Sequence, residues 1–197
     1  MTESMMNSER VIWWVRHGPT HARSMVGWSD LPADLSDRAA LGRLDAFLPR
    51  AAPIFSSDLA RTVATADALA AGRSRLPHQA GLREMNFGAW EQRAFADIEA
   101  EDPDRIRAFW SEPGDVAPPG GESWNALSQR VETTLNALEA PKGDVIIVAH
   151  FGVILSQVQR ALGVEATEAF SQPIDPLSVT RIRYGASRTV ELINHIP

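Results

Sequence analysis

Hydrophobic positions along the chain form short apolar runs, separated by longer stretches in which apolar residues recur every three or four positions. Runs rich in β-branched and aromatic residues predict strands at about residues 11–16, 53–56, 144–149, 178–185 and 188–194. The stretches between the first three have helical spacing. Strands that alternate with helices imply right-handed crossovers and a mainly parallel sheet covered on both faces. The pattern therefore predicts a three-layer α/β/α fold.

Capping residues and breakers mark the expected helix boundaries. Asp58 directly follows the second strand and is expected to cap the next helix. Residues 91–110 have a helical pattern interrupted at Pro103. Glu91 is expected to begin that helix, because a carboxylate is favoured at the positive end of the helix dipole. Ser123 follows a loop full of breakers and is expected to cap another helix.

Length and composition narrow the class of protein. The chain has 197 residues, of which 44% are hydrophobic and 22% charged, so residues 1–197 are expected to form one globular domain. The formal net charge of -6 argues against a nucleic-acid partner. The absence of cysteine excludes disulfides and thiolate chemistry. Since no apolar run is long enough for a membrane span and no signal-peptide pattern is found, we expect a cytoplasmic protein with no membrane partner.

Histidines and arginines gather where the predicted parallel strands end. Arg16 and His17 end the first strand, Arg61 follows the second, and His150 follows the third. Ligands of parallel α/β sheets bind outside the carboxyl ends of the strands. A single histidine at a strand end is more often a hydrogen-bonded cap than a catalyst. The convergence of four such residues nevertheless favours a shared site.

The residue types at this edge favour phosphoryl chemistry. Two arginines repel a metal ion, and two histidines without cysteine or clustered carboxylates make a poor ligand set, so no metal cofactor is expected. Guanidinium groups suit phosphoryl oxygens because they form bidentate, charge-assisted hydrogen bonds. Their charge also favours a neutral imidazole, which has a nucleophilic nitrogen. We therefore expect phosphoryl transfer assisted by histidine.

A departing alkoxide needs a proton, and two glutamates are candidates for supplying it. Glu84 lies in an otherwise apolar loop punctuated by glycine, where its pKa can be raised for acid-base work. Glu91 is better explained as the start of a helix. Glu84 is therefore the preferred acid-base group.

Five ordered blocks of the sequence resemble the histidine phosphatase superfamily, the group of the phosphoglycerate mutases and related small phosphatases. The blocks are VRHGPT, SSDLARTVATA, LREMNFGAWE, PPGGESW and VAHFGV, and the similarity runs from about Val11 to about Leu192. The resemblance implies a phosphoglycerate mutase-like domain that uses a phosphohistidine and no metal. By similarity, His17 is phosphorylated and Glu84 is the proton donor. The residues implied to hold the transferred group are Arg16, Arg61 and His150.

Three positions depart from the pattern of that family. Pro19 stands where Glu or Gln is common, Arg23 stands near a usual Asn, and Ala39 replaces a usual Gly. These changes leave the reacting groups in place but alter the expected substrate contacts. Thr20 can offer a hydroxyl to the phosphate, although a turn-stabilising role explains it equally well. Arg23 can add positive charge toward the substrate, although a solvated loop arginine is the simpler reading.

The resemblance favours a phosphatase over a mutase, because related mutases generally carry longer insertions that close the site. The layout around LREMNFGAWEQRAFADI and PPGGESWNALSQRV looks like that of the alpha-ribazole phosphatases and the broad small-molecule phosphatases. The expected substrate is a phosphorylated small molecule. A mutase-type transferase, a non-catalytic phosphate-binding relative and a metal-dependent hydrolase remain alternatives. The residues Gly120–Ser123 are either a lid edge or an ordinary loop, and monomer and homodimer both stay open.

Overall fold

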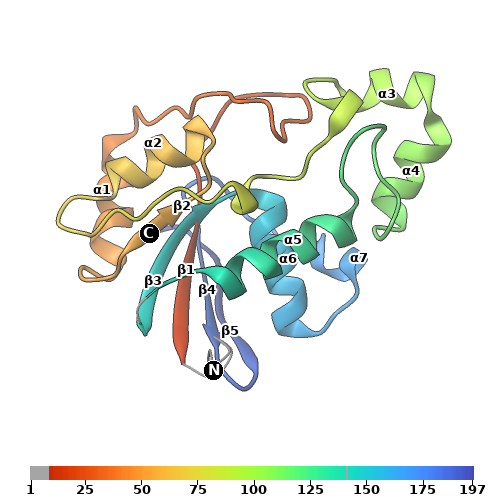
Figure 1. Cartoon of the computed structure of the whole chain (residues 1–197). Helices are drawn as coiled ribbons and strands as arrows, with labels where there is room; N and C mark the ends of the chain where they lie inside the picture. Colours follow the sequence, from red (N-terminus) through yellow and green to blue (C-terminus); the bar gives the residue numbers. More distant parts are fainter. Residues whose placement is uncertain (1–8, 141) are drawn as a thin grey trace.

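The computed structural model describes residues 9–140 and 142–197. Its centre is a five-stranded sheet in the order β2-β3-β1-β4-β5 (Figure 1). The strands β1, β2 and β3 are parallel to one another, whereas β4 and β5 are antiparallel to their neighbours. The bounds of the strands are Arg10–Arg16 for β1, Ile54–Ser56 for β2, Gly143–Ala149 for β3, Val179–Tyr184 for β4 and Arg188–His195 for β5. The predicted strands are thus confirmed, and the sheet is mixed.

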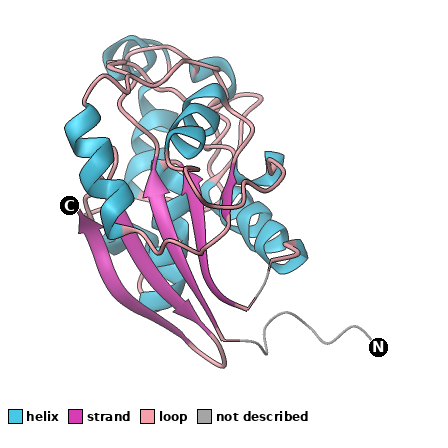
Figure 2. Ribbon diagram, turned by 90° about the vertical axis from the view of Figure 1, so that its left-hand side faces the viewer, coloured by secondary structure: helices cyan, strands magenta, loops and turns pink. Residues whose placement is uncertain are grey.

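Helices cover both faces of this sheet (Figures 1 and 2). Their bounds are Arg38–Phe47 for α1, Ala60–Ala68 for α2, Phe95–Glu101 for α3, Pro103–Ser111 for α4, Trp124–Ala137 for α5, Phe151–Leu162 for α6 and Ala166–Ala169 for α7. Short 3₁₀ turns lie at Ala80–Leu82 and Gly88–Trp90. The predicted three-layer α/β/α architecture is therefore confirmed.

Two hydrophobic clusters separate the layers. One contains Leu44 of α1 and Ala66 of α2 together with alternate side chains of β3, and the other joins α5 and α6 to the opposite face. The adjacent residues Trp13 and Trp14 belong to different clusters, because successive side chains of a strand point to opposite faces. No helix in the described part of the chain is long and apolar enough to cross a membrane.

Two helix starts differ from the sequence prediction. Asp58 does not cap α2, since the N-cap residue is Leu59 and no side chain of the cap bonds to the helix. Instead, Asp58 accepts hydrogen bonds from Arg83 at 2.7 and 2.6 Å. The backbone N–H of Ala60 is bound by a carboxylate oxygen of Asp30 at 2.7 Å. The prediction was wrong because Arg83 binds the carboxylate of Asp58, and Asp30 binds the backbone N–H of Ala60.

The region of residues 91–110 is helical in part. The break at Pro103 is confirmed, with Asp102 accepting from the backbone N–H of Arg105 as the cap of α4. The helix before the break begins at Phe95, so Glu91 does not start it. Ser123 caps α5 as predicted by accepting from the N–H of Ala126 at 3.2 Å.

Candidate active site

The carboxyl ends of the three parallel strands bring the predicted residues to one edge of the sheet. Arg16 is the last residue of β1 and His17 follows it, while Arg61 lies in the first turn of α2, after β2. His150 follows β3 and is the N-cap of α6. The imidazole rings of His17 and His150 have centroids 5.1 Å apart. The parallel topology thus places both histidines and both arginines around a common centre.

His17 has a defined tautomer and a low proton affinity. Its side chain is buried, and Nδ1 lies 2.7 Å from the carbonyl oxygen of Gly18. Because a carbonyl only accepts, Nδ1 must carry the proton, so Nε2 of the neutral ring keeps its lone pair. Burial, and then the charges of Arg61 and Arg16, lower the pKa of His17 to about 3, although the bond to Gly18 opposes the shift. At neutral pH, Nε2 is therefore a free nucleophile.

His150 is fully buried and is oriented through one ring nitrogen. Its Nε2 lies 2.7 Å from Oγ of Ser57, whose hydroxyl also bonds that of Thr62 at 2.7 Å. Its Nδ1 is buried without a hydrogen-bond partner among the described residues. Burial, and then His17 and the nearby arginines, lower the pKa of His150 well below its usual range. An orphaned nitrogen beside His17 is suited to donate to an oxygen of a bound phosphoryl group.

The two arginines are held by backbone carbonyls. Arg61 is 1% exposed and donates to the oxygens of Gly27 at 2.6 Å and Ser29 at 2.9 Å. Arg16 donates to the oxygen of Ile174 at 2.6 Å, and its Nε is buried without a partner among the described residues. Neither forms a salt bridge with a described carboxylate. Carbonyls fix the guanidinium groups without neutralising them, so their charge is available to an anion.

The carboxyl group of Glu84 lies against the first turn of α6, next to this centre. Its Oε1 accepts from the backbone N–H of Met85 at 2.9 Å, and the N–H of Gly152 lies 3.1 Å from both carboxyl oxygens. Burial raises the pKa of Glu84 and outweighs these hydrogen bonds and the charges of Arg61 and Arg16. A carboxyl with a raised pKa can hold a proton and release it to a leaving oxygen.

Three residues that were not singled out as site residues position the backbone of Glu84. Its carbonyl oxygen accepts from the indole Nε1 of Trp28 at 2.8 Å and from Arg130 at 3.2 Å. Arg130 in turn pairs with Glu122 at 2.7 Å. The block PPGGESW, which contains Glu122, was the available signal. Arg130 has no such signal, because its contacts are formed only when α5 packs against the loop of Glu84.

Glu91 organises the loop that holds Arg61. Its carboxylate accepts from the backbone N–H groups of Gly27, Trp28 and Ser29 at 3.1, 2.7 and 3.1 Å. Burial alone would raise the pKa of Glu91, but the hydrogen bonds from this loop outweigh it and lower the pKa. This loop supplies the carbonyls that bind Arg61. The prediction that Glu91 begins a helix is therefore wrong, and its carboxylate instead holds the loop of residues 27–29 in place.

Thr20 and Arg23 are not joined to the other candidates by any hydrogen bond among the described residues. Thr20 is partly buried in the loop after β1, and Arg23 is exposed. Pro19 uses its carbonyl oxygen to accept from the N–H of Asp34 at 2.7 Å, which fastens the same loop. Substrate contacts of Thr20 and Arg23 stay predictions.

A small apolar cavity adjoins Glu84. Apart from Glu84 and Gly152, the residues lining it are apolar and mostly aromatic: Met85, Phe87, Phe109, Trp110, Trp124, Phe151 and Phe170. Several of the rings meet edge to face, with Trp124 and Phe170 having centroids 4.7 Å apart. With a volume of about 40 Å³, the cavity is too small for an aromatic ring and has room for a small apolar group at most.

A neutral buried histidine, a second histidine, two arginines and a carboxyl group with a raised pKa together make a site suited to phosphoryl transfer. The chain belongs to the histidine phosphatase superfamily: the model of branch 1 of that family matches residues 12–195. The resemblance carried by the five sequence blocks is thereby confirmed.

Relatives place the chain among the small phosphatases and mutase-like proteins. It is 32% identical to the adenosylcobalamin/alpha-ribazole phosphatase of Salmonella typhimurium, covering 79% of this chain and 81% of that one. It is 33% identical to phosphoglycerate mutase-like protein 4 of Arabidopsis thaliana, covering 82% and 76%. The solved structure of Bacillus stearothermophilus YhfR matches with a TM-score of 0.83 and 26% identity, covering 95% and 98%. The protein is a histidine phosphatase whose substrate is a small phosphorylated metabolite.

Proposed function

We propose that the protein is a metal-independent phosphomonoester hydrolase that works through a phosphohistidine at His17. The observation that carries this proposal is the bond between Nδ1 of His17 and the carbonyl of Gly18. It leaves Nε2 unprotonated beside the guanidinium groups of Arg16 and Arg61, which are held by backbone carbonyls. A nucleophile and an anion site are thus held at the same strand end.

The first step forms the phosphoenzyme. Nε2 of His17 attacks phosphorus in line with the ester oxygen, the new P–N bond forms as the P–O bond breaks, and Glu84 gives its proton to the departing oxygen. Arg16, Arg61 and the Nδ1–H of His150 bind the three remaining phosphoryl oxygens. The products of this step are an alcohol and a phosphohistidine.

The second step returns the enzyme. Glu84, now a carboxylate, takes a proton from water as the water oxygen attacks phosphorus. The P–N bond breaks, and inorganic phosphate and neutral His17 result. The same arginines and His150 bind the oxygens in both steps, so their binding strengthens where charge develops.

The apolar cavity beside Glu84 has a volume of about 40 Å³ and supports an organic phosphate with no more than a small apolar group at this point. We propose alpha-ribazole phosphate as the particular substrate, because the Salmonella typhimurium relative is named an adenosylcobalamin/alpha-ribazole phosphatase. Hydrolysis is preferred to mutase chemistry because the family resemblance implies that related mutases generally carry longer insertions that close the site. A non-catalytic role is disfavoured by the presence of both His17 and Glu84.

Further assignments follow the same reasoning. We place residues 1–197 in one domain, which is supported by the family match over residues 12–195. A cytoplasmic location stays a prediction. A nucleic-acid partner is disfavoured by the formal net charge of -6.

Hydrolysis of p-nitrophenyl phosphate by His17→Ala tests the proposed function. We expect this variant to lose activity, while His78→Ala, a change at an exposed histidine outside the site, keeps it. Wild-type activity should also survive exhaustive chelation. Full activity in His17→Ala would overturn the mechanism, and activity that vanishes on chelation and returns with a divalent metal would favour a metal-dependent hydrolase instead.

A further inference from the structure

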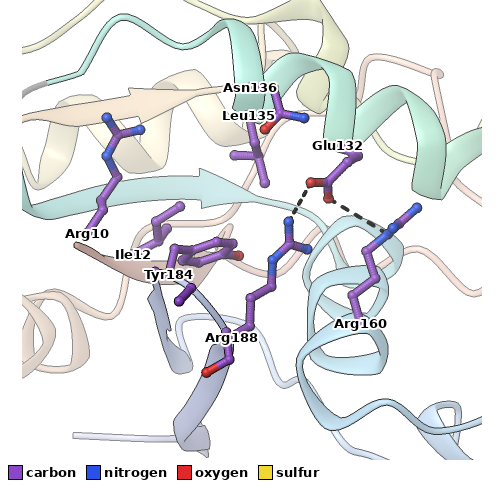
Figure 3. A pocket seen from close by; sticks show the side chains of 11 residues that line it. Arg10, Ile12, Glu132, Leu135, Asn136, Arg160, Tyr184 and Arg188 are labelled. Atoms are coloured by element: carbon purple, nitrogen blue, oxygen red, sulfur yellow. Dashed lines mark hydrogen bonds and ion pairs between the residues drawn. The ribbon is translucent and has the colours of Figure 1, made fainter. Parts of the chain in front are cut away.

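A second cavity lies at the end of the sheet opposite the active site, and Figure 3 shows its lining from close by. Arg10, which begins β1, is part of its lining, whereas His17 follows the other end of that strand. Seven residues of extended chain separate the two regions by about 20 Å. The cavity has a volume of about 360 Å³ and reaches the turn between β4 and β5. It is therefore separate from the site at the strands' carboxyl ends.

The charges around this cavity are predominantly positive. Arg10 of β1, Arg160 of α6 and Arg188 of β5 line it, and Glu132 of α5 is the one acidic residue among the described lining residues. Glu132 pairs with Arg188 and lies 3.8 Å from Nε of Arg160, so a single carboxylate is shared by two guanidinium groups (Figure 3). The lining carries a formal excess of two positive charges in a protein whose formal net charge is -6.

Arg10 is the least compensated of these cations. Its side chain is 9% exposed, and it donates from one terminal nitrogen to the carbonyl oxygen of Ala140 at 2.9 Å. Its Nε is buried without a partner, and it forms no salt bridge with any described residue. Burial lowers the pKa of Arg10. A buried guanidinium without a counter-charge is costly, and an anion in the cavity would offset that cost.

The floor of the cavity is apolar and firmly held. It is formed by Ile12, Leu135 and the ring of Tyr184. The guanidinium of Arg188 lies 5.0 Å from the centre of the Tyr184 ring. The hydroxyl of Tyr184 accepts from the indole of Trp14 at 3.2 Å and donates to Gln157 at 3.2 Å. These bonds fix the aromatic wall in place, and a cavity of this size has room for more than a bare phosphate.

We propose that this cavity is a second ligand site, which binds a small organic phosphate with its anionic group at Arg10, on the side of the cavity away from Arg160 (Figure 3). Its apolar or aromatic part packs on Leu135 and Tyr184. No histidine is found among the described lining residues, so the ligand is bound and not hydrolysed. The site does not depend on the activity proposed for the other end of the sheet.

Calorimetric titration with phenylphosphonate, a non-hydrolysable member of this ligand class, tests the proposal. We expect a binding event in the wild-type protein that weakens by about tenfold or more in Arg10→Gln, because the substitution removes charge-assisted hydrogen bonds. Arg183→Gln is the matched control: this exposed arginine of β4 pairs with Glu191 and does not line the cavity. Its titration should equal that of the wild type.

Competitive inhibition kinetics with phenylphosphonate separate the two sites. The inhibition constant reports the active site alone, so it should be the same in all three proteins and also shows that the variants are folded. The proposal is overturned if calorimetry finds a single event whose dissociation constant equals the inhibition constant. It is also overturned if the additional event persists unchanged in Arg10→Gln, or weakens equally in Arg183→Gln.

Discussion

Gly152→Ala is predicted to displace the carboxyl group of Glu84 and thereby impair general acid catalysis. A Cβ atom at residue 152 would lie 2.6 Å from Oε1 of Glu84, whereas ordinary contact begins at 3.4 Å. It would also lie 3.2 Å from Cδ2 of Leu127, so the new methyl group cannot move away from Glu84 in that direction. The carboxyl must therefore shift by about 0.8 Å, and a misplacement of about 1 Å can cost a factor of about 100 in rate.

The assay compares two kinds of substrate. For an alkyl phosphate such as glycerol 2-phosphate, we expect kcat/KM of Gly152→Ala to fall about 100-fold, since the alkoxide must be protonated as it leaves. For p-nitrophenyl phosphate the loss should be much smaller, because nitrophenolate leaves with little help. Gly42→Ala is the matched control, because a Cβ there meets nothing within 4 Å. Equal losses for both substrates, or no loss for either, would refute the assignment of the proton donor.

Three further predictions address the same site. Glu84→Gln should reduce activity on alkyl phosphates more than on aryl phosphates, which steady-state kinetics on both will measure; equal losses would count against a general acid. Because the pKa of His17 is lowered to about 3, the folded state binds fewer protons than the unfolded state below about pH 6.5. His17 should therefore lower the free energy of unfolding, by at most about 1.4 kcal/mol per pH unit, as the pH falls from about 6.5 toward 3; urea titrations should show a shallower fall in His17→Gln, and identical slopes would contradict the shift. Glu91→Ala should destabilise the protein by about 2–3 kcal/mol, because it leaves four backbone N–H groups, three of them in partly buried hydrogen bonds, without their acceptor. The exposed Glu139→Ala is its control in the same denaturation assay, and a loss no larger than that of the control would show that Glu91 does not clamp the loop.

The architecture was predictable because its signals are local. The run VIIVA in β3 is apolar on both faces, which is typical of a strand buried in a parallel sheet. Once the parallel order was assigned, the position of Arg16, His17 and His150 at one edge followed from topology. The mixed sheet was harder to predict, because the hydrophobic pattern of β4 does not specify which strands it pairs with.

The contacts of acidic residues were harder to predict because their partners are distant in sequence. Glu91 has the local features of a helix start, yet its carboxylate binds a loop more than sixty residues away along the chain. Asp58 pairs with Arg83 in place of a helix N-terminus. The arginines that line the second cavity have no sequence motif, because three separate elements contribute one residue each: Arg10, Arg160 and Arg188. Local propensity describes none of these tertiary choices.

Trapping the phosphoenzyme tests the central claim most directly. The protein is mixed with an excess of a phosphomonoester, quenched in alkali within the first turnovers, digested, and mapped by mass spectrometry under conditions that preserve the acid-labile P–N bond. The mechanism predicts one phosphoryl group on the imidazole of His17, and none in His17→Ala. A phosphoryl group on a different residue, or full turnover with no phosphoenzyme in a rapid-quench experiment able to detect one, would contradict it.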